Sequence, residues 1–271
     1  MENPFENNSF QKRITSMLKI DARRMFTSPF FYIMLGISFI IPILILVMTG
    51  MMAGSVSVNP QTGETSVMQG FENVWQIIGS VSISGNENQM GMQMDLVSMC
   101  NINMMYFGIA ALVCVFIADD FRSGYAKNLF TVRAKKNDYV ISKTAVCFIG
   151  GAAMLLAFFI GSIIGGAIAG LSFETTGFHA GNLIACLFSK MALSSIFVSI
   201  YTLASVIAKQ RLWLSILLSF GIGMFLFTIV PMVSPLNAGF LHVVLCLAGG
   251  TTFAIGLGVI SNFVLKKTAL V

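Results

Sequence analysis

Long apolar runs alternate with short polar segments along the whole chain. Six such runs stand out, and they cover residues 30–52, 99–118, 144–171, 183–208, 212–233 and 241–265. Each reaches the ~20 residues that a helix needs to cross the roughly 30 Å hydrocarbon core of a bilayer. Within lipid, a helix satisfies all its backbone hydrogen bonds internally. The pattern therefore predicts an all-α integral membrane protein with six transmembrane helices.

Cationic residues follow the same alternation and predict the orientation. Five Lys and Arg precede the first run, six lie between the second and third, two lie between the fourth and fifth, and two follow the sixth. The other segments between runs carry none. Because Lys and Arg are enriched in cytoplasmic loops, we expect both termini in the cytoplasm. The expected location is the cell (plasma) membrane. An even number of spans is the one that keeps the cations on one side.

Composition leaves no room for a sizeable soluble domain. Of 271 residues, 56% are hydrophobic and 10% are charged, whereas soluble domains carry about 25% charged residues. The basic pI of 9.0 does not indicate nucleic-acid binding, because the basic residues border apolar runs. We expect a cytoplasmic N-terminal segment (1–29), a transmembrane domain (30–265) and a cytoplasmic tail (266–271). The long outer loop, residues 53–98, is either a cap or a substrate gate.

An amphipathic helix is predicted over residues 9–26, ahead of the first span. Its cations, Arg23 and Arg24 among them, lie opposite an apolar arc into which Asp21 intrudes. Such a helix is typical of the membrane interface, with cations toward anionic headgroups. Pro29 separates it from the first span. The apolar arc consists of Phe10, Ile14, Met17, Leu18, Ala22 and Met25.

The cytoplasmic loop at residues 119–143 is the second segment with a distinctive pattern. It opens with two acidic residues that suit a helix N-terminus. A short helix would then place Phe121, Tyr125 and Leu129 at i, i+4 and i+8, as a ridge with Arg122 and Lys127 beside it. Such a ridge suits a groove on a partner protein. The alternative is a basic loop that lies on the membrane.

Small residues in the third run allow close helix packing. Gly161, Gly165 and Gly166 would let a neighbouring backbone approach. The neighbour is either another helix of the same chain or a second copy.

Ionisable residues are scarce inside the predicted spans. Lys190 is the clear exception; it either snorkels or pairs internally, or it contacts an anionic or dipolar substrate in the pathway. We find no nucleophile–base pair, no metal-spaced cluster and no Gly-rich phosphate loop followed by Lys-Ser/Thr. The sequence therefore predicts no enzyme activity and no metal, and transport energy would come from another subunit.

Two segments carry a family resemblance. Residues 119–128 read DDFRSGYAKN, followed by KNDY at 136–139 and Ser142-Lys143, and residues 23–29 read RRMFTSP. Both resemble permease subunits of ABC-2 type transporters, which show an acidic residue, a Gly, a Lys, then Ser/Thr-Arg, an aromatic and Ser-Lys before the third span. Tyr125 stands where Thr is common, and Lys136 where Arg is common.

The resemblance implies a coupling helix in this loop that docks into a separate ATPase subunit. The implied docking residues are Asp120, Phe121, Arg122, Gly124, Tyr125, Lys127 and Leu129. It further implies an ATPase dimer that binds ATP and Mg, and a second copy of this permease or a homologous permease. The expected function is export of a hydrophobic or amphipathic peptide, with antimicrobial-peptide immunity as the analogy. The alternatives are an ion-coupled carrier or channel, and a membrane scaffold or immunity protein that transports nothing.

Overall fold

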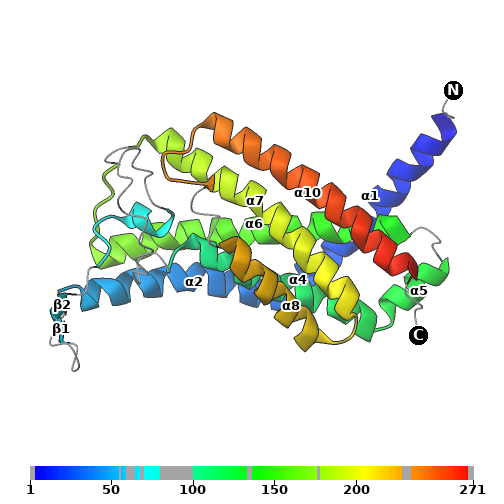
Figure 1. Ribbon diagram of the computed structural model, residues 1–271, viewed down its shortest axis with the longest axis horizontal. Helices are drawn as coiled ribbons and strands as arrows, with labels where there is room; N and C mark the ends of the chain where they lie inside the picture. Colours follow the sequence, from blue (N-terminus) through cyan, green and yellow to red (C-terminus); the bar gives the residue numbers. More distant parts are fainter. Residues whose placement is uncertain are drawn as a thin grey trace.

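Helices dominate the structure, a computed structural model of the 271-residue chain (Figure 1). The structure describes residues 4–54, 56–58, 65–67, 70–79, 100–132, 136–175, 178–227 and 233–267. Within these residues the helices are α1 (Pro4–Thr27), α2 (Pro29–Met52), α4 (Met105–Arg122), α5 (Tyr125–Val132), α6 (Lys136–Ala169), α7 (Ala180–Ala208), α8 (Leu212–Phe227) and α10 (Phe240–Lys267). Two short strands, β1 (Val56–Val58) and β2 (Thr65–Val67), and two 3-10 turns, η1 (Val74–Ile77) and η2 (Ile102–Met104), complete the described elements.

Five of the described helices are long and apolar enough to cross a membrane. They are α2, η2 together with α4, α6, α7 and α10. They correspond to five of the six predicted runs, so the chain is an all-α, multi-pass membrane protein. The run at 212–233 differs, because its described helix, α8, has 16 residues and residues 228–232 lie outside the described part. A span at this run, which would bring the total to six, stays a prediction.

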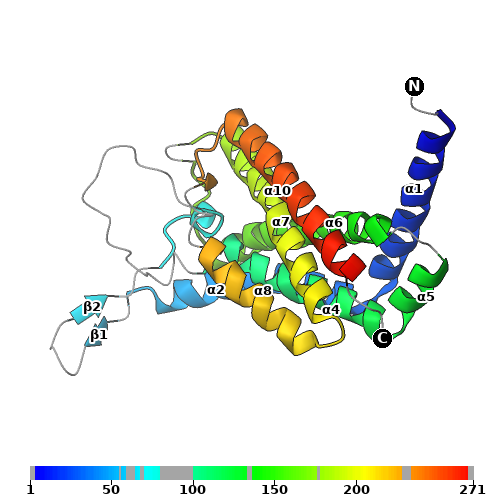
Figure 2. The same cartoon turned by 45° about the vertical axis from the view of Figure 1, so that its right-hand side comes forward.

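The helix α1 leaves one end of the bundle at an angle to the spans (Figures 1 and 2). It contains the predicted 9–26 segment. Ser28, with an extended backbone, separates it from α2, and Pro29 occupies the first turn of α2. Pro is favourable there because the missing N–H has no partner in the first helical turn. The predicted break before the first span is confirmed.

Close backbone contacts hold α6 against α2. A Cβ at Gly161 would collide with the carbonyl of Phe39, and one at Gly165 would lie 2.7 Å from the Cα of Ile43. The third glycine, Gly166, faces the side chain of Val74 in η1. The neighbour of this glycine face is therefore within the same chain.

Part of the predicted outer loop, the 3-10 turn η1, packs onto the bundle at the end opposite α1 (Figure 1). Val74, Ile77 and Ile78 are fully buried, and η1 packs against α6. The backbone of Val74 also donates a hydrogen bond to the carbonyl of Ser172, 3.1 Å away. This part of the loop is thus anchored, whereas residues 80–99 lie outside the described residues.

The α1 end of the bundle also carries the described cations other than Lys190. The end of α4, α5, the start of α6, the α7–α8 turn and the end of α10 all lie there (Figure 1). Among the described acidic residues, Glu72 and Glu174 lie near η1. The described aspartates, by contrast, lie at the α1 end with the cations; they are Asp21, Asp119, Asp120 and Asp138. We refer to the α1 end as the cationic end.

Candidate functional site

The predicted docking helix is two helices joined by a turn. The first, α4, ends at Arg122, and Gly124 has a φ of +74°, a left-handed conformation that interrupts the helix. The second, α5, begins at Tyr125. The prediction of one helix that carries Phe121, Tyr125 and Leu129 as a ridge is therefore wrong. The prediction that Asp119 and Asp120 begin a helix is also wrong, because both lie in the last turn of α4.

A buried ion cluster lies beneath this turn. The ammonium group of Lys143 lies 2.8 Å from a carboxylate oxygen of Asp21 and 2.7 Å from one of Asp120. All three side chains are fully buried. The hydroxyl of Ser142 donates to the other oxygen of Asp21 at 2.6 Å. A lysine from α6 thus bridges carboxylates from α1 and α4.

Arg24 and Tyr139 complete the cluster around Asp120. The guanidinium of Arg24 donates to Asp120 at 2.6 Å, and the hydroxyl of Tyr139 donates to it at 2.9 Å. Burial alone would lower the pKa of Arg24, but the Asp120 carboxylate raises it above its ordinary value. The guanidinium also lies 3.9 Å from the ring centroid of Tyr125. Two carboxylates and two cations balance, which limits the cost of removing them from water.

A second ion pair fastens α1 to α6. Arg13 donates to the carboxylate of the buried Asp138 at 3.0 Å. The predicted apolar arc of α1 lies on this same inward side, because Met17 and Met25 are buried. Of the other arc residues, Ile14 and Leu18 are half-buried and Phe10 is exposed, as is the cation Arg23. Much of the arc therefore packs on the chain itself, and contact of α1 with lipid stays a prediction.

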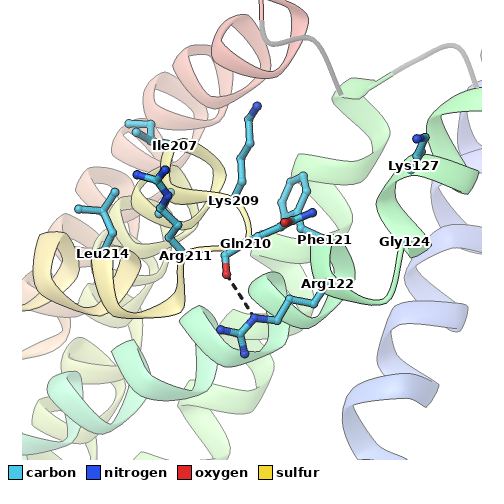
Figure 3. Close-up of a pocket in the computed structure, with 10 residues that line it drawn as sticks. Phe121, Arg122, Gly124, Lys127, Ile207, Lys209, Gln210, Arg211 and Leu214 are labelled. Atoms are coloured by element: carbon cyan, nitrogen blue, oxygen red, sulfur yellow. Dashed lines mark hydrogen bonds between the residues drawn. The ribbon is translucent and has the colours of Figure 1, made fainter. Parts of the chain in front are cut away.

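A hollow opens between two turns (Figure 3). The α4–α5 turn contributes Phe121, Arg122, Gly124 and Lys127, and the α7–α8 turn contributes residues 207–211 and Leu214. Its volume is about 560 Å³. A hydrogen bond joins the two turns, from the Nε of Arg122 to the carbonyl of Gln210 at 3.2 Å. The hollow is therefore assembled from segments about 90 residues apart in the sequence.

The hollow is cationic. Arg122, Lys127, Lys209 and Arg211 contribute four cations, and none of the described residues that line it is acidic. The side chains of Arg122, Lys127 and Arg211 are exposed, so an approaching molecule meets them first. Such a surface attracts an anionic partner at long range.

The seven predicted docking residues divide between the hollow and the interior. Phe121, Arg122, Gly124 and Lys127 line the hollow. Asp120 lies in the ion cluster, Tyr125 lies against Arg24, and Leu129 packs against the core. The α4–α5 turn thus presents Arg122 and Lys127 outward, whereas Asp120, Tyr125 and Leu129 contact the interior. The reason is that Asp120 has partners on α1 and α6 that a reading of the loop alone does not reveal.

The predicted pathway contact, Lys190, is held inside the bundle. Its ammonium group donates to Asn103 at 2.9 Å and to the hydroxyl of Ser234 at 3.1 Å. The side chain is buried. Nearby, the hydroxyl of Tyr106 donates to the backbone carbonyl of Lys190 at 3.0 Å. The structure therefore places this lysine in an internal polar cluster, which agrees with the first of the two alternatives from the sequence, snorkelling or internal pairing.

Sequence reasoning missed the roles of Asp21 and Lys143. In the sequence, Asp21 is an intrusion on an apolar arc, and Lys143 is one of the loop cations. A carboxylate on a face that becomes buried requires a cation. The position of Asp21 on the apolar arc was therefore a signal that a cationic partner lies nearby. No group of three or more His, Cys, Asp and Glu in the described part of the chain is placed to hold a metal ion.

Comparisons with family models, with curated proteins and with solved structures found no match to this chain.

Proposed function

We propose that the chain is the membrane-spanning permease subunit of an ABC exporter that is driven by a separate ATPase subunit. The resemblance at residues 23–29 and 119–143 and the multi-pass helical fold support this proposal. The ATPase dimer would bind ATP and Mg, and two permeases, identical or homologous, would form the pathway. The cargo class is a hydrophobic or amphipathic peptide, and the location is the plasma membrane.

The topology that goes with this proposal has six spans and two cytoplasmic termini. In it, α8 and the residues that follow complete the fifth span, and α1 lies at the membrane interface. The concentration of Lys and Arg at the cationic end supports this end as the cytoplasmic one. The long outer loop would then lie on the far side.

The observation that carries the proposal is the cationic hollow and its connection to the spans. The α4–α5 turn forms one wall of the hollow, and the residue before Phe121 is Asp120 of the ion cluster. That cluster joins α1, α4 and α6 through Arg24, Asp120 and Lys143. A displacement of the turn by a bound ATPase would therefore act on three helices together, which is what energy coupling requires.

The docking role predicts a charge-dependent complex. We expect that Arg122→Glu/Lys127→Glu lowers the amount of ABC ATPase that co-purifies with the tagged chain by about tenfold, because like charges then face each other. Added salt should weaken the wild-type complex as well. The measurement is quantitative mass spectrometry of the purified complex. Arg122→Gln/Lys127→Gln should give an intermediate value.

The matched control is Lys19→Glu, an exposed cation of α1 outside the hollow. It should retain the ATPase at the wild-type level. Loss with Lys19→Glu but not with the Arg122/Lys127 variant would move the docking surface to α1. If no ABC ATPase co-purifies with the wild-type chain, the proposed function itself fails.

A second candidate function is an ion-coupled carrier or channel, and Lys190 is the observation that favours it. Its buried ammonium group has amide and hydroxyl partners, and none of the ion pairs among the described residues involves it. Ionisable groups inside a membrane often mark ion pathways. Solute uptake into vesicles that contain only this chain and an ion gradient would favour this function. Transport that requires the ATPase and ATP would exclude it, and transport under neither condition would favour a scaffold.

A further inference from the structure

An apolar groove runs between α6, α7 and α10. Its volume is about 470 Å³. Thr144 and Phe148 of α6, Ser195 of α7, and Thr251, Ile255 and Gly258 of α10 are among its lining residues. The helix α10 packs mainly along α7 and meets α6 less extensively. Small side chains on the facing surfaces leave the remaining space between α6 and α10 open.

Two hydroxyl groups in the groove walls, those of Thr251 and Ser195, already donate hydrogen bonds to backbone carbonyls. The hydroxyl of Thr251 donates to the carbonyl of Leu247 at 2.9 Å, and that of Ser195 donates to the carbonyl of Ala192 at 2.7 Å. Both bonds stay within their own helices. The outer wall, Ile255 and Val259, is exposed to the surroundings of the bundle. Most of the other lining residues are apolar, so the groove suits an apolar occupant that enters from the lipid side.

One end of the groove leads to a group of lysines. Asn137 is the lining residue at the start of α6, and the ammonium group of its neighbour Lys136 donates to the carbonyl of Leu265 at 2.8 Å. Lys266 and Lys267 follow directly and are exposed. None of the ion pairs among the described residues uses these three lysines, because the nearby Asp138 pairs with Arg13.

We propose that this groove binds an anionic phospholipid. An acyl chain fills the apolar space between α6 and α10, and the headgroup phosphate lies among Lys136, Lys266 and Lys267. The charge at the mouth argues for this occupant over an apolar peptide or a second copy of the chain, neither of which requires three cations there. Basic positions next to a membrane helix attract anionic headgroups. The proposal is independent of the transport function.

Two glycines on α10 give a matched test of the acyl-chain site. A Cβ at Gly258 or at Gly256 would meet nothing within 4 Å, so both positions accept a side chain. Only Gly258 lines the groove. Each full-length variant is reconstituted in bilayers of equal phosphatidylglycerol and phosphatidylcholine, re-extracted in mild detergent and weighed with its bound lipid by native mass spectrometry.

The wild-type chain should retain bound phosphatidylglycerol in preference to phosphatidylcholine. Gly258→Phe should lower the retained phospholipid by about tenfold, equivalent to a loss of about 1.4 kcal/mol, whereas Gly256→Phe should match wild type. If Gly258→Phe does not give a monodisperse protein, Ala254→Leu replaces it, because Ala254 also lines the groove.

The headgroup site is tested by Lys136→Gln/Lys266→Gln/Lys267→Gln. This variant should still retain phospholipid, but its preference for phosphatidylglycerol should fall by about tenfold or more. The control Lys19→Gln removes an exposed cation of α1 and should keep the preference. Equal retention by the two glycine variants overturns the proposal, as does a preference that survives in the triple-lysine variant. A wild-type chain that retains an apolar peptide in place of phospholipid would also overturn it.

Discussion

Replacing Lys143 with methionine tests whether the buried ion cluster holds α1 and α4 on α6. Methionine keeps most of the volume and removes the cation that contacts both Asp21 and Asp120. Asp120 keeps Arg24 and Tyr139 as partners, so Asp21 is the group most affected. The hydroxyl of Ser142 would then be the main group that contacts its buried carboxylate.

The expected cost follows from leaving a buried carboxylate without its cation. Removing one partner of a buried pair costs about 3–5 kcal/mol, and we expect Lys143→Met to lower the free energy of unfolding by that amount. Asp21→Asn should cost less, about 1–3 kcal/mol, because Lys143 keeps Asp120. The double variant Asp21→Asn/Lys143→Met should be more stable than the sum of the single effects predicts, by about 1–3 kcal/mol.

The assay is unfolding in mixed micelles with an increasing fraction of dodecyl sulfate, followed by circular dichroism. The control Lys19→Met removes an exposed cation of α1 and should change stability by less than about 0.5 kcal/mol. The reasoning fails if Lys143→Met costs no more than this control. It fails equally if the double variant equals the sum of the single variants, because Asp21 and Lys143 would then not interact.

Three further predictions concern topology, energy source and packing. Single cysteines at Ser66 and Ser123, in a background without the native cysteines, should react with an impermeant thiol reagent on intact cells at Ser66 only; labelling at Ser123 would refute the orientation. The purified chain alone should hydrolyse no ATP, because it has no phosphate-binding loop, and turnover without a partner would contradict this. Gly161→Ala should lower the free energy of unfolding by about 1–3 kcal/mol, because a Cβ there collides with the carbonyl of Phe39. The control Gly36→Ala, where a Cβ meets open space, should be neutral or slightly stabilising. Equal effects of the two substitutions would show that α2 and α6 separate easily.

The helical membrane fold could be predicted from the sequence because it depends on local properties. The length and hydropathy of a single run of residues are enough to identify a span, and Pro29 marks the break before α2. The docking loop was predicted less well. The i, i+4, i+8 spacing of Phe121, Tyr125 and Leu129 favours one helix, whereas Gly124 favours a break. The structure has the break, because Gly124 adopts a positive φ.

The sequence by itself determined that lipid surrounds this chain and which ends of its helices gather the cations. Both follow from transfer of side chains between water and hydrocarbon, which each residue undergoes independently. The tertiary structure decided which groups are partners. Lys143 meets carboxylates 122 and 23 residues earlier in the chain, and Arg122 meets the turn at Gln210. Such pairings depend on how helices pack, because burial makes an unpaired charge costly only after the neighbouring helices have closed around it.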